Sequence, residues 1–408
     1  MRGTTHNRTT RVLARALYLT AIVNSLISSA YGQETTLAAS PAKPKSWSAE
    51  DMLHVGIFDI LPSMRAGVTY DDNIYISSLN KQSDVVFSIS PYVLLGAGDY
   101  IQKEESLLTI EYSPTFFIFS KNQSKNAIDH DAKLDATWRG GNWTAGVNQG
   151  VKDFSGTVVE VGNRVDRQIY DTLGFVRYEV SPKTSIELEA LQSINNYESP
   201  YHSFNEWVVG PWVDYWLTPK VRLGAGVKGG WLDVQQSSNQ NYVQGLLRML
   251  YLWSEKLEIN VSGGGEYREY HDSSQSRTEP VFSLGANYKP FDNTTLVIEG
   301  YRKTRTSVVL ANQNYALSGV GGRVSQVVRD NWTLSLGAGY ENLDYHSTQA
   351  NVVSTRRDNY YFTRVGVDWD ATDRLSLGVF YLYRQNDSTT ATSEFSNNQV
   401  GLIATYAF

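Results

Sequence analysis

The chain has no cysteine, no long apolar run and no surplus of basic residues, and each absence excludes a class of protein. Without cysteine there is neither a disulfide framework nor a thiolate metal site. The apolar stretches are all shorter than the roughly 18 residues that a transmembrane helix needs. The formal net charge is −6, which argues against a nucleic-acid binder because phosphate contacts need a basic surface.

The N-terminal region differs in composition from the rest of the chain. Arg2, Arg8, Arg11 and Arg15 precede a short apolar stretch, and a small-residue site ends at Gly32. This order is typical of a secretory signal peptide, which predicts a signal over 1–32. Residues 33–61 are rich in proline, lysine and serine at their start, and we expect a periplasmic lead-in or plug segment there.

From Pro62 onward the sequence consists of alternating runs about 9 to 13 residues long, the length that a tilted membrane strand needs. In one example Trp207, Val209 and Val213 alternate with Gly210 and Asp214. Such strands expose only every second residue to lipid, so a globally polar chain is compatible with a membrane barrel. We therefore assign 62–408 to an all-β, transmembrane antiparallel barrel.

Tight turns and longer polar segments separate these runs in strict alternation. The tight turns are Gly96–Asp99, Arg139–Asn142, Ser181–Thr184, Thr218–Lys220, Trp253–Lys256, Lys289–Thr294, Arg329–Asn331 and Ala371–Arg374. The longer segments are Asp71–Asp84, Ser120–Asp129, Lys152–Arg164, Asn195–Ser203, Gln235–Asn241, His271–Thr278, Thr304–Asn314, Glu341–Asp358 and Arg384–Ser396. Eight turns and nine loops join eighteen strands, so we expect about 18 strands (16 to 18) with both chain ends in the periplasm.

Aromatic residues on the predicted outer face gather at the two ends of the strands. Those near tight turns are Trp138, Trp143, Tyr215, Trp253, Trp332, Trp369 and Phe408, and those near loops are Tyr170, Trp207, Trp231, Tyr267, Tyr340, Tyr361 and Tyr383. Two belts at opposite ends match the two interfacial girdles of an outer-membrane barrel. A β-propeller, whose blade spacing is similar, is disfavoured because no blade signature recurs.

The last nine residues, Val400–Phe408, form an alternating strand that ends on an aromatic residue. The stretch resembles the C-terminal strand signal of bacterial outer-membrane barrels. That resemblance implies localisation in the cell outer membrane, with outer-membrane lipid and the barrel insertion machinery as partners.

The opening of the barrel region carries a second resemblance. Ala66–Ser77 reads Ala-Gly-Val-Thr-Tyr-Asp-Asp-Asn-Ile-Tyr-Ile-Ser, and Val85–Leu95 follows with Ile89, Ser90 and Pro91 at its centre. This opening resembles the family named Putative β-barrel porin 2. The resemblance implies an outer-membrane barrel, and such proteins are often linked to export of surface polysaccharide. The family has no catalytic motif to transfer.

Charged residues of both signs fall on the predicted inward face. Burying such charges in a dry core would be costly, whereas the wall of a wet pore accommodates them. The candidates for pore lining are Arg177, Asp214, Arg222, Lys228, Arg248, Glu258, Glu299, Arg323, Arg364 and Asp368. They could focus ions or bind a sugar chain, or they could pair across neighbouring strands and stiffen the wall. The inward aromatic residues Trp212, Trp216 and Tyr301 are too scattered to predict a sugar track.

Enzymatic and metal sites are the competing hypotheses for function. His130, His271 and His346 lie beside acids, as a hydrolase in the barrel wall would require. Adjacent strand residues point to opposite faces, however, so this proximity predicts no catalytic pair. Asp71-Asp72-Asn73 could bind calcium, but an Asx-type turn explains it better. We expect no catalytic residue, no metal and no cofactor.

The sequence therefore predicts a porin-like channel of the outer membrane. Its cargo would be small polar solutes or surface polysaccharide, and nucleic acid is not expected as a partner. The alternative is a structural or plugged barrel, and a barrel-wall hydrolase is less favoured.

Overall fold

The computed structural model describes residues 53–271, 273, 275–329 and 331–408. The predicted signal peptide, 1–32, and most of the predicted lead-in, 33–61, lie outside the described residues. Within the described part of the chain, no helix has both the length and the apolar content that a membrane span requires.

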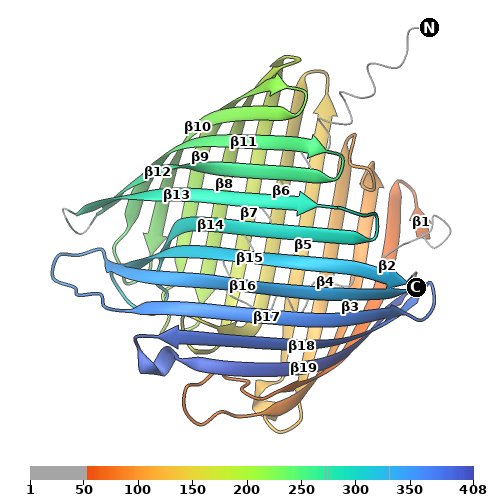
Figure 1. Cartoon of the computed structure of the whole chain (residues 1–408). Helices are drawn as coiled ribbons and strands as arrows, with labels where there is room; N and C mark the ends of the chain where they lie inside the picture. The colour runs from red at the N-terminus through yellow and green to blue at the C-terminus, as the bar shows by residue number, and fades with distance from the viewer. Residues whose placement is uncertain (1–52, 272, 274, 330) are drawn as a thin grey trace.

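Eighteen strands, β2 to β19, form one closed antiparallel barrel, as the alternating sequence predicts (Figure 1). Each strand pairs with the next along the chain, and β19 pairs with β2 to complete the cylinder. The strands are β2 Phe58–Asp71, β3 Asp84–Gly98, β4 Leu107–Phe119, β5 Ala127–Gly140, β6 Trp143–Val158, β7 Asn163–Ser181, β8 Thr184–Tyr197, β9 Phe204–Thr218, β10 Val221–Val234, β11 Gln240–Ser254, β12 Leu257–Tyr270, β13 Ser276–Tyr288, β14 Thr294–Thr306, β15 Gln313–Arg329, β16 Trp332–Ser347, β17 Arg357–Asp370, β18 Leu375–Ser388 and β19 Phe395–Ala407.

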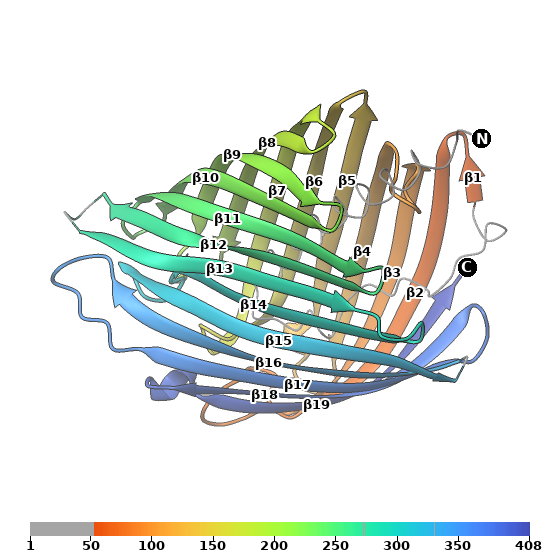
Figure 2. The same cartoon turned by 45° about the horizontal axis from the view of Figure 1, so that its top comes forward.

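A short additional strand, β1 (Leu53–Val55), pairs with the start of β2 and takes no part in closing the barrel. Figure 2 places β1 beside β2, at the end of the barrel where the chain terminates. The first barrel strand begins at Phe58, so the predicted boundary at Pro62 falls inside β2. Two short 3₁₀ helices, η3 (Gln123–Lys125) and η4 (Ala391–Ser393), lie in loops at the other end.

The alternation of the sequence divides each strand into an outer and an inner face. In β7, Val176 is 44% exposed and its neighbour Arg177 only 3%, and in β9 Val213 is 51% exposed and Asp214 only 1%. The apolar side chains face outward because lipid is their solvent, and the charged side chains face the lumen. Aromatic residues of the two predicted belts, such as Trp138, Trp253, Trp207 and Trp231, are exposed on the outer face.

A polar seam ties the first barrel strand to the last. The backbone N–H of Asn73 donates to Asp71 Oδ1 at 2.8 Å, which confirms the predicted Asx-type turn. Asn397 Nδ2 donates to Asp71 Oδ1 at 2.6 Å, and the backbone N–H of Asn398 donates to Asp72 Oδ1 at 2.7 Å. Asn73 itself is fully buried. The Asp-Asp-Asn segment of the family-like opening therefore closes the barrel at its extracellular rim.

Several strands extend farther on the loop side than the sequence predicts. The predicted loop Lys152–Arg164 is in fact the end of a long hairpin, because β6 continues to Val158 and β7 begins at Asn163. A polar residue of this hairpin, Thr157, contacts a strand on another side of the barrel. Arg384 of β18 donates to Thr157 Oγ1 at 3.1 Å.

Candidate functional site

The lumen wall of β7 to β11 carries a network of ion pairs in its periplasmic half. Arg177 Nη2 lies 2.5 Å from Glu187 Oε2, and Arg248 Nη2 lies 2.9 Å from Glu187 Oε1. Asp214 accepts hydrogen bonds from Arg248 Nε at 2.8 Å and from Arg248 Nη2 at 2.5 Å. Lys228 Nζ lies 2.9 Å from Glu189 Oε2. Five neighbouring strands are thus joined through their inward side chains.

An aromatic ring and two glycines allow these charges to lie flat against the wall. The guanidinium carbon of Arg248 lies 4.2 Å from the ring centre of Trp212, whose indole N–H donates to Glu189 at 3.1 Å. A Cβ atom on Gly226 would come within 2.5 Å of the Trp212 ring, and one on Gly224 within 2.3 Å of Asp214 Oδ1. Glycine is needed at both positions because the side chains of neighbouring strands fill the space above them.

The other predicted lining residues also point inward. Arg222 lies at the edge of the network, where the charges of Arg177 and Asp214 act on it, and its Cζ is 5.6 Å from the ring centre of Trp216. Arg364 stacks on Phe380 at 4.2 Å on the opposite wall, and the charges of Arg323 and Asp368 act on it. Glu299 of β14 is near Arg323, and Glu258 is on β12. The structure thus brings Arg177, Asp214, Arg222, Lys228 and Arg248 together and places the other five elsewhere on the wall.

Loops from opposite sides of the barrel meet over its extracellular end. Ile76, from the loop after β2, packs with Tyr360 of β17 and Phe395 of the neighbouring strand β19, and with Val159 of the distant β6–β7 hairpin. Val308, from the loop after β14, packs with Phe204, Leu232 and Val234 in a second cluster. Ile76 and Val159 have no exposed surface. These contacts make a lid, defined here as Ile76, Val159, Glu160, Val308 and Arg356.

Glu160 anchors the lid through polar contacts. Its carboxylate accepts hydrogen bonds from Ser307 Oγ at 2.5 Å and from the backbone N–H of Val308 at 3.2 Å. Arg356 Nη2 donates to the backbone oxygen of Glu160 at 2.7 Å and to Asp358 Oδ2 at 2.6 Å. Burial raises the pKa of the Glu160 carboxyl above its usual range, although the charge of Arg356 opposes this shift.

Sequence reasoning assigned these lid residues to polar loops and missed their contacts. The available signal was the presence of short apolar pieces within the loops, Val158-Val159 and Val308-Val309-Leu310. An apolar side chain in a loop is stabilised only if it leaves water. Short apolar pieces within a loop therefore indicate that the loop packs against another part of the protein.

His130 and the acids beside it in the sequence lie on opposite faces of β5. His130 faces outward and stacks on Tyr112, and its Nδ1 lies 2.9 Å from the Tyr112 hydroxyl, whereas Asp129 and Asp131 point to the other face. Among residues 53–408, apart from the three positions left out, no group of three or more His, Asp or Glu side chains is arranged to hold a metal.

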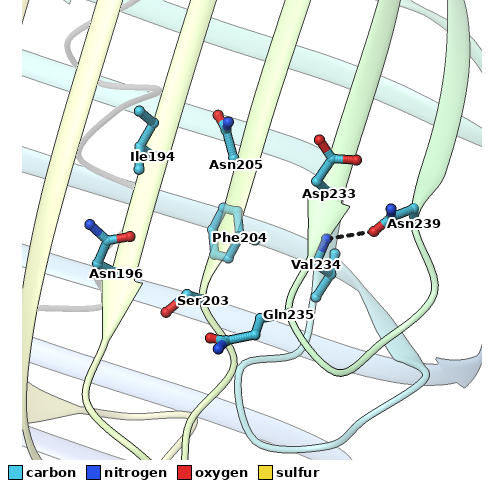
Figure 3. Close-up of a pocket in the computed structure, with 9 residues that line it drawn as sticks. All are labelled: Ile194, Asn196, Ser203, Phe204, Asn205, Asp233, Val234, Gln235 and Asn239. Atoms are coloured by element: carbon cyan, nitrogen blue, oxygen red, sulfur yellow. Dashed lines mark hydrogen bonds between the residues drawn. The ribbon is translucent and has the colours of Figure 1, made fainter.

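A shallow pocket of about 400 Å³ lies at the extracellular ends of β8, β9 and β10 (Figure 3). Ile194, Asn196, Asn205 and Asp233 contribute to its lining, and the backbone N–H of Val234 donates to Asn239 Oδ1 at 2.9 Å. These four lining residues are on the same strand faces as Trp207 and Trp231, which are exposed outside the barrel. The lining also includes Phe204 and Val234, which face inward and pack with Val308 in the second cluster, so the pocket lies at the barrel rim next to that cluster.

Comparisons with known proteins find several similar solved structures. The solved structures of OpdO from Pseudomonas aeruginosa (10% identity, TM-score 0.46) and OccAB3 from Acinetobacter baumannii (9% identity, TM-score 0.44) each cover 86% of this chain. The matched parts are 97% of OpdO and 99% of OccAB3. OprD from Pseudomonas aeruginosa matches at 7% identity and TM-score 0.42, over 86% of this chain and 95% of its own. No curated protein sequence matches.

A family model matches residues 121–408, which make up most of the barrel. The segment Ala66–Ser77, which suggested the same family from the sequence, lies before the matched range and forms the seam between β2 and β19. The match places the protein in the outer membrane of a Gram-negative bacterium. The chain belongs to the Putative beta-barrel porin 2 family.

Proposed function

We propose that the protein is a diffusion channel for small, charged or polar solutes, with an extracellular lid that controls access. The inward wall of paired and stacked charges inside a closed eighteen-strand barrel is the observation that carries this function. Barrels of about 16 to 18 strands are wide enough for an aqueous channel. Fixed charges along such a channel favour ions of the opposite sign.

Small solutes fit the wall better than a polysaccharide chain does. A sugar slide needs exposed aromatic rings on which successive sugars can stack. Trp212 is only 3% exposed because Arg248 covers it, and the hydroxyl of Tyr301 donates to Glu341. The inward aromatic residues are therefore already engaged by charged neighbours. The same occupied wall has no arrangement that favours hydrolysis over transport.

We also propose that Val400–Phe408 is the segment that the barrel insertion machinery reads. Val400, Leu402, Tyr406 and Phe408 are exposed on the outer face of β19, and the ring centres of Tyr406 and Phe408 lie 5.2 Å apart. An aromatic, lipid-facing end strand is the feature that would be presented before the barrel closes.

Ion selectivity in planar bilayers tests the channel function. The double variant Arg323→Glu and Arg364→Glu changes two inward charges outside the β7–β11 network, so the wall should still assemble. We expect the reversal potential in a salt gradient to move toward cation preference, because negative charge attracts cations in the lumen. Arg357→Glu is the matched control, since Arg357 is exposed at the outer rim and pairs with Asp344 at 3.0 Å.

Two results would count against this function. Unchanged selectivity in the double variant would show that these residues do not line the conducting path. No conductance under any condition, in protein shown to be folded and inserted, would favour a structural barrel instead.

A further inference from the structure

The wall of the barrel opens between the extracellular ends of β13 and β14. Backbone pairing between these strands stops at Phe282 and Arg302. β13 nevertheless continues along β12 as far as Ser276, and β14 continues along β15 as far as Thr306. Figures 1 and 2 show the two strands separating at this end. Residues 276–281 of β13 therefore form an edge that β14 does not cover.

The gap arises because the last residues of β14 turn into the barrel. The Thr304 side chain forms a hydrogen bond with Glu266 of β12, two strands away from its own. On the next strand, Asn314 and Gln240 of β11 exchange side-chain hydrogen bonds at 3.0 and 2.8 Å. The ends of β14 and β15 thus lie over the inner face of the neighbouring wall instead of continuing beside β13.

Two arginine side chains, from β13 and β14, meet at this gap, and a buried histidine of β16 lies beside them. Arg302 Nη2 lies 2.9 Å from Glu279 Oε2, and Arg277 Nε binds the same carboxylate. Two guanidinium groups thus share one carboxylate, which leaves a net positive charge. His346 of β16, only 8% exposed, is close enough to feel the charges of Arg277 and Glu279. We call Arg277, Glu279, Arg302 and His346 the β13–β14 notch.

One donor of the notch, Arg302 Nε, is buried without a hydrogen-bond partner in the described part of the chain. His346 is hydrogen-bonded to the backbone of Asp344. Buried donors of this kind are costly unless something accepts their hydrogen bonds. An uncovered sheet edge is equally unfavourable next to hydrocarbon, where no water can satisfy the backbone.

An apolar strip runs down the outer wall below Arg302. Arg277 and Glu279 alternate with Phe282 and belong to the inner side of β13, so the notch joins the two faces through the gap between β13 and β14. Phe282 is 48% exposed, Leu284 39% and Ile298 46%, and all three face the lipid from β13 and β14. On β12, Tyr267 of the extracellular aromatic belt pairs with Thr278. The notch is therefore at the level of the outer-leaflet headgroups, and the strip is at the level of the acyl chains.

We propose that the β13–β14 notch binds the phosphate of a phosphorylated glycolipid of the outer leaflet. Planar guanidinium groups match phosphate oxygens, and the bound phosphate would accept from Arg302 Nε and from the guanidinium group of Arg277. The acyl chains would lie along Phe282, Leu284 and Ile298. A cationic notch above an apolar strip fits an amphiphile better than a free anion.

Native mass spectrometry of the full mature chain in detergent, titrated with diphosphorylated lipid A, tests this site. We expect the double variant Arg277→Gln and Arg302→Gln to bind at least about tenfold more weakly, because each charge-assisted hydrogen bond contributes that much or more. Arg357→Gln is the matched control and should bind like the unaltered protein, since this arginine also pairs with a carboxylate at the rim. Glu279→Gln should bind lipid A more tightly, because the guanidinium groups of Arg277 and Arg302 no longer pair with a carboxylate at this position.

The remaining outcomes separate the possible ligands. Equal binding by the double variant and the control would overturn the site, provided that both retain the gel shift of a folded barrel. If inorganic phosphate at equal concentration displaces the lipid, the notch is a free-anion site and the lipid proposal fails. If lipid A without phosphate binds as well as the diphosphorylated form, the notch does not recognise phosphate.

Discussion

Asp214 shows how single residues set the stability of the lumen wall. It is 1% exposed and accepts two hydrogen bonds from Arg248, while Arg177 Nη2 lies 3.6 Å away. Removing one partner of such a network leaves buried positive charge without compensation, which costs more than the pair contributes when intact. The β7–β11 network is therefore most sensitive at its shared carboxylates.

We expect Asp214→Asn to lower the free energy of unfolding by about 3 kcal/mol, measured by urea unfolding in lipid vesicles. Asp387→Asn is the control, because Asp387 is exposed on the outer rim, where it accepts a hydrogen bond from Gln385 Nε2. That variant should stay within about 0.5 kcal/mol of the unaltered protein. Equal effects of the two substitutions would mean that the network contributes no special stability.

At the scale of elements, the β6–β7 hairpin is the strand pair that departs most from the wall. Its end contacts β17, β18 and the loop after β14, which lie on the far side of the barrel in the strand order. A hairpin keeps its backbone hydrogen bonds when it bends inward, so it can cross the lumen without leaving polar groups unsatisfied. Its position then depends on side chains such as Glu160.

The raised pKa of Glu160 makes closure of the lid depend on pH. In the closed lid the buried carboxyl holds its proton more strongly than it would in an open, solvated hairpin. The closed lid is therefore most stable when the pH is below the ordinary pKa of a carboxyl group. Its stability falls as the pH rises from that ordinary pKa to the raised pKa of Glu160 in the closed lid. Arg356 and Asp358, the charged neighbours, oppose and reinforce this shift respectively.

We expect the open probability of single channels to rise with pH over the acid range. Glu160→Gln should remove this dependence and keep the lid closed, because an amide oxygen still accepts from Ser307 and Val308. Glu198→Gln, which changes an exposed acid of the loop after β8, should leave the pH profile unchanged. A profile that persists in Glu160→Gln would assign the titration to another group.

For the whole molecule, the sequence predicts the barrel well and the lid poorly, and the difference has a physical cause. The strand count and the two faces follow from local alternation, which each strand carries by itself. The same alternation places Arg177, Asp214 and Arg248 on the lumen face. Which of these charges pair is not local, because Arg248 reaches Glu187 from a strand 61 positions away.

The lid is still less visible in the sequence. Glu160 meets Ser307 across 147 positions, and Arg384 meets Thr157 across 227. No periodic pattern in the sequence encodes contacts between loops. These contacts exist only because closure of the barrel brings distant loops together. The inward turn of β14 is hidden for the same reason: the polar residues from Thr304 onward predict a loop, whereas in the structure β14 continues to Thr306.

A disulfide across the lid would show whether loop contacts control access to the lumen. The natural chain has no cysteine, so a pair introduced at Ile76→Cys and Val159→Cys can react only with each other. Both side chains are fully buried in one cluster that joins the loop after β2 to the β6–β7 hairpin. Oxidation should lock the two elements together, and a short bifunctional maleimide can bridge them if the thiols are too far apart.

We expect the oxidised double variant to conduct little at any pH and to regain its conductance when a reducing agent is added. Each single-cysteine variant should behave alike with and without oxidant, because no bridge can form. The pH dependence assigned to Glu160 should also disappear in the locked state, since the hairpin can no longer open when the carboxyl ionises. If the bridge forms and conductance is unchanged, solutes pass the lid in its closed form, and access is set by the charged wall alone.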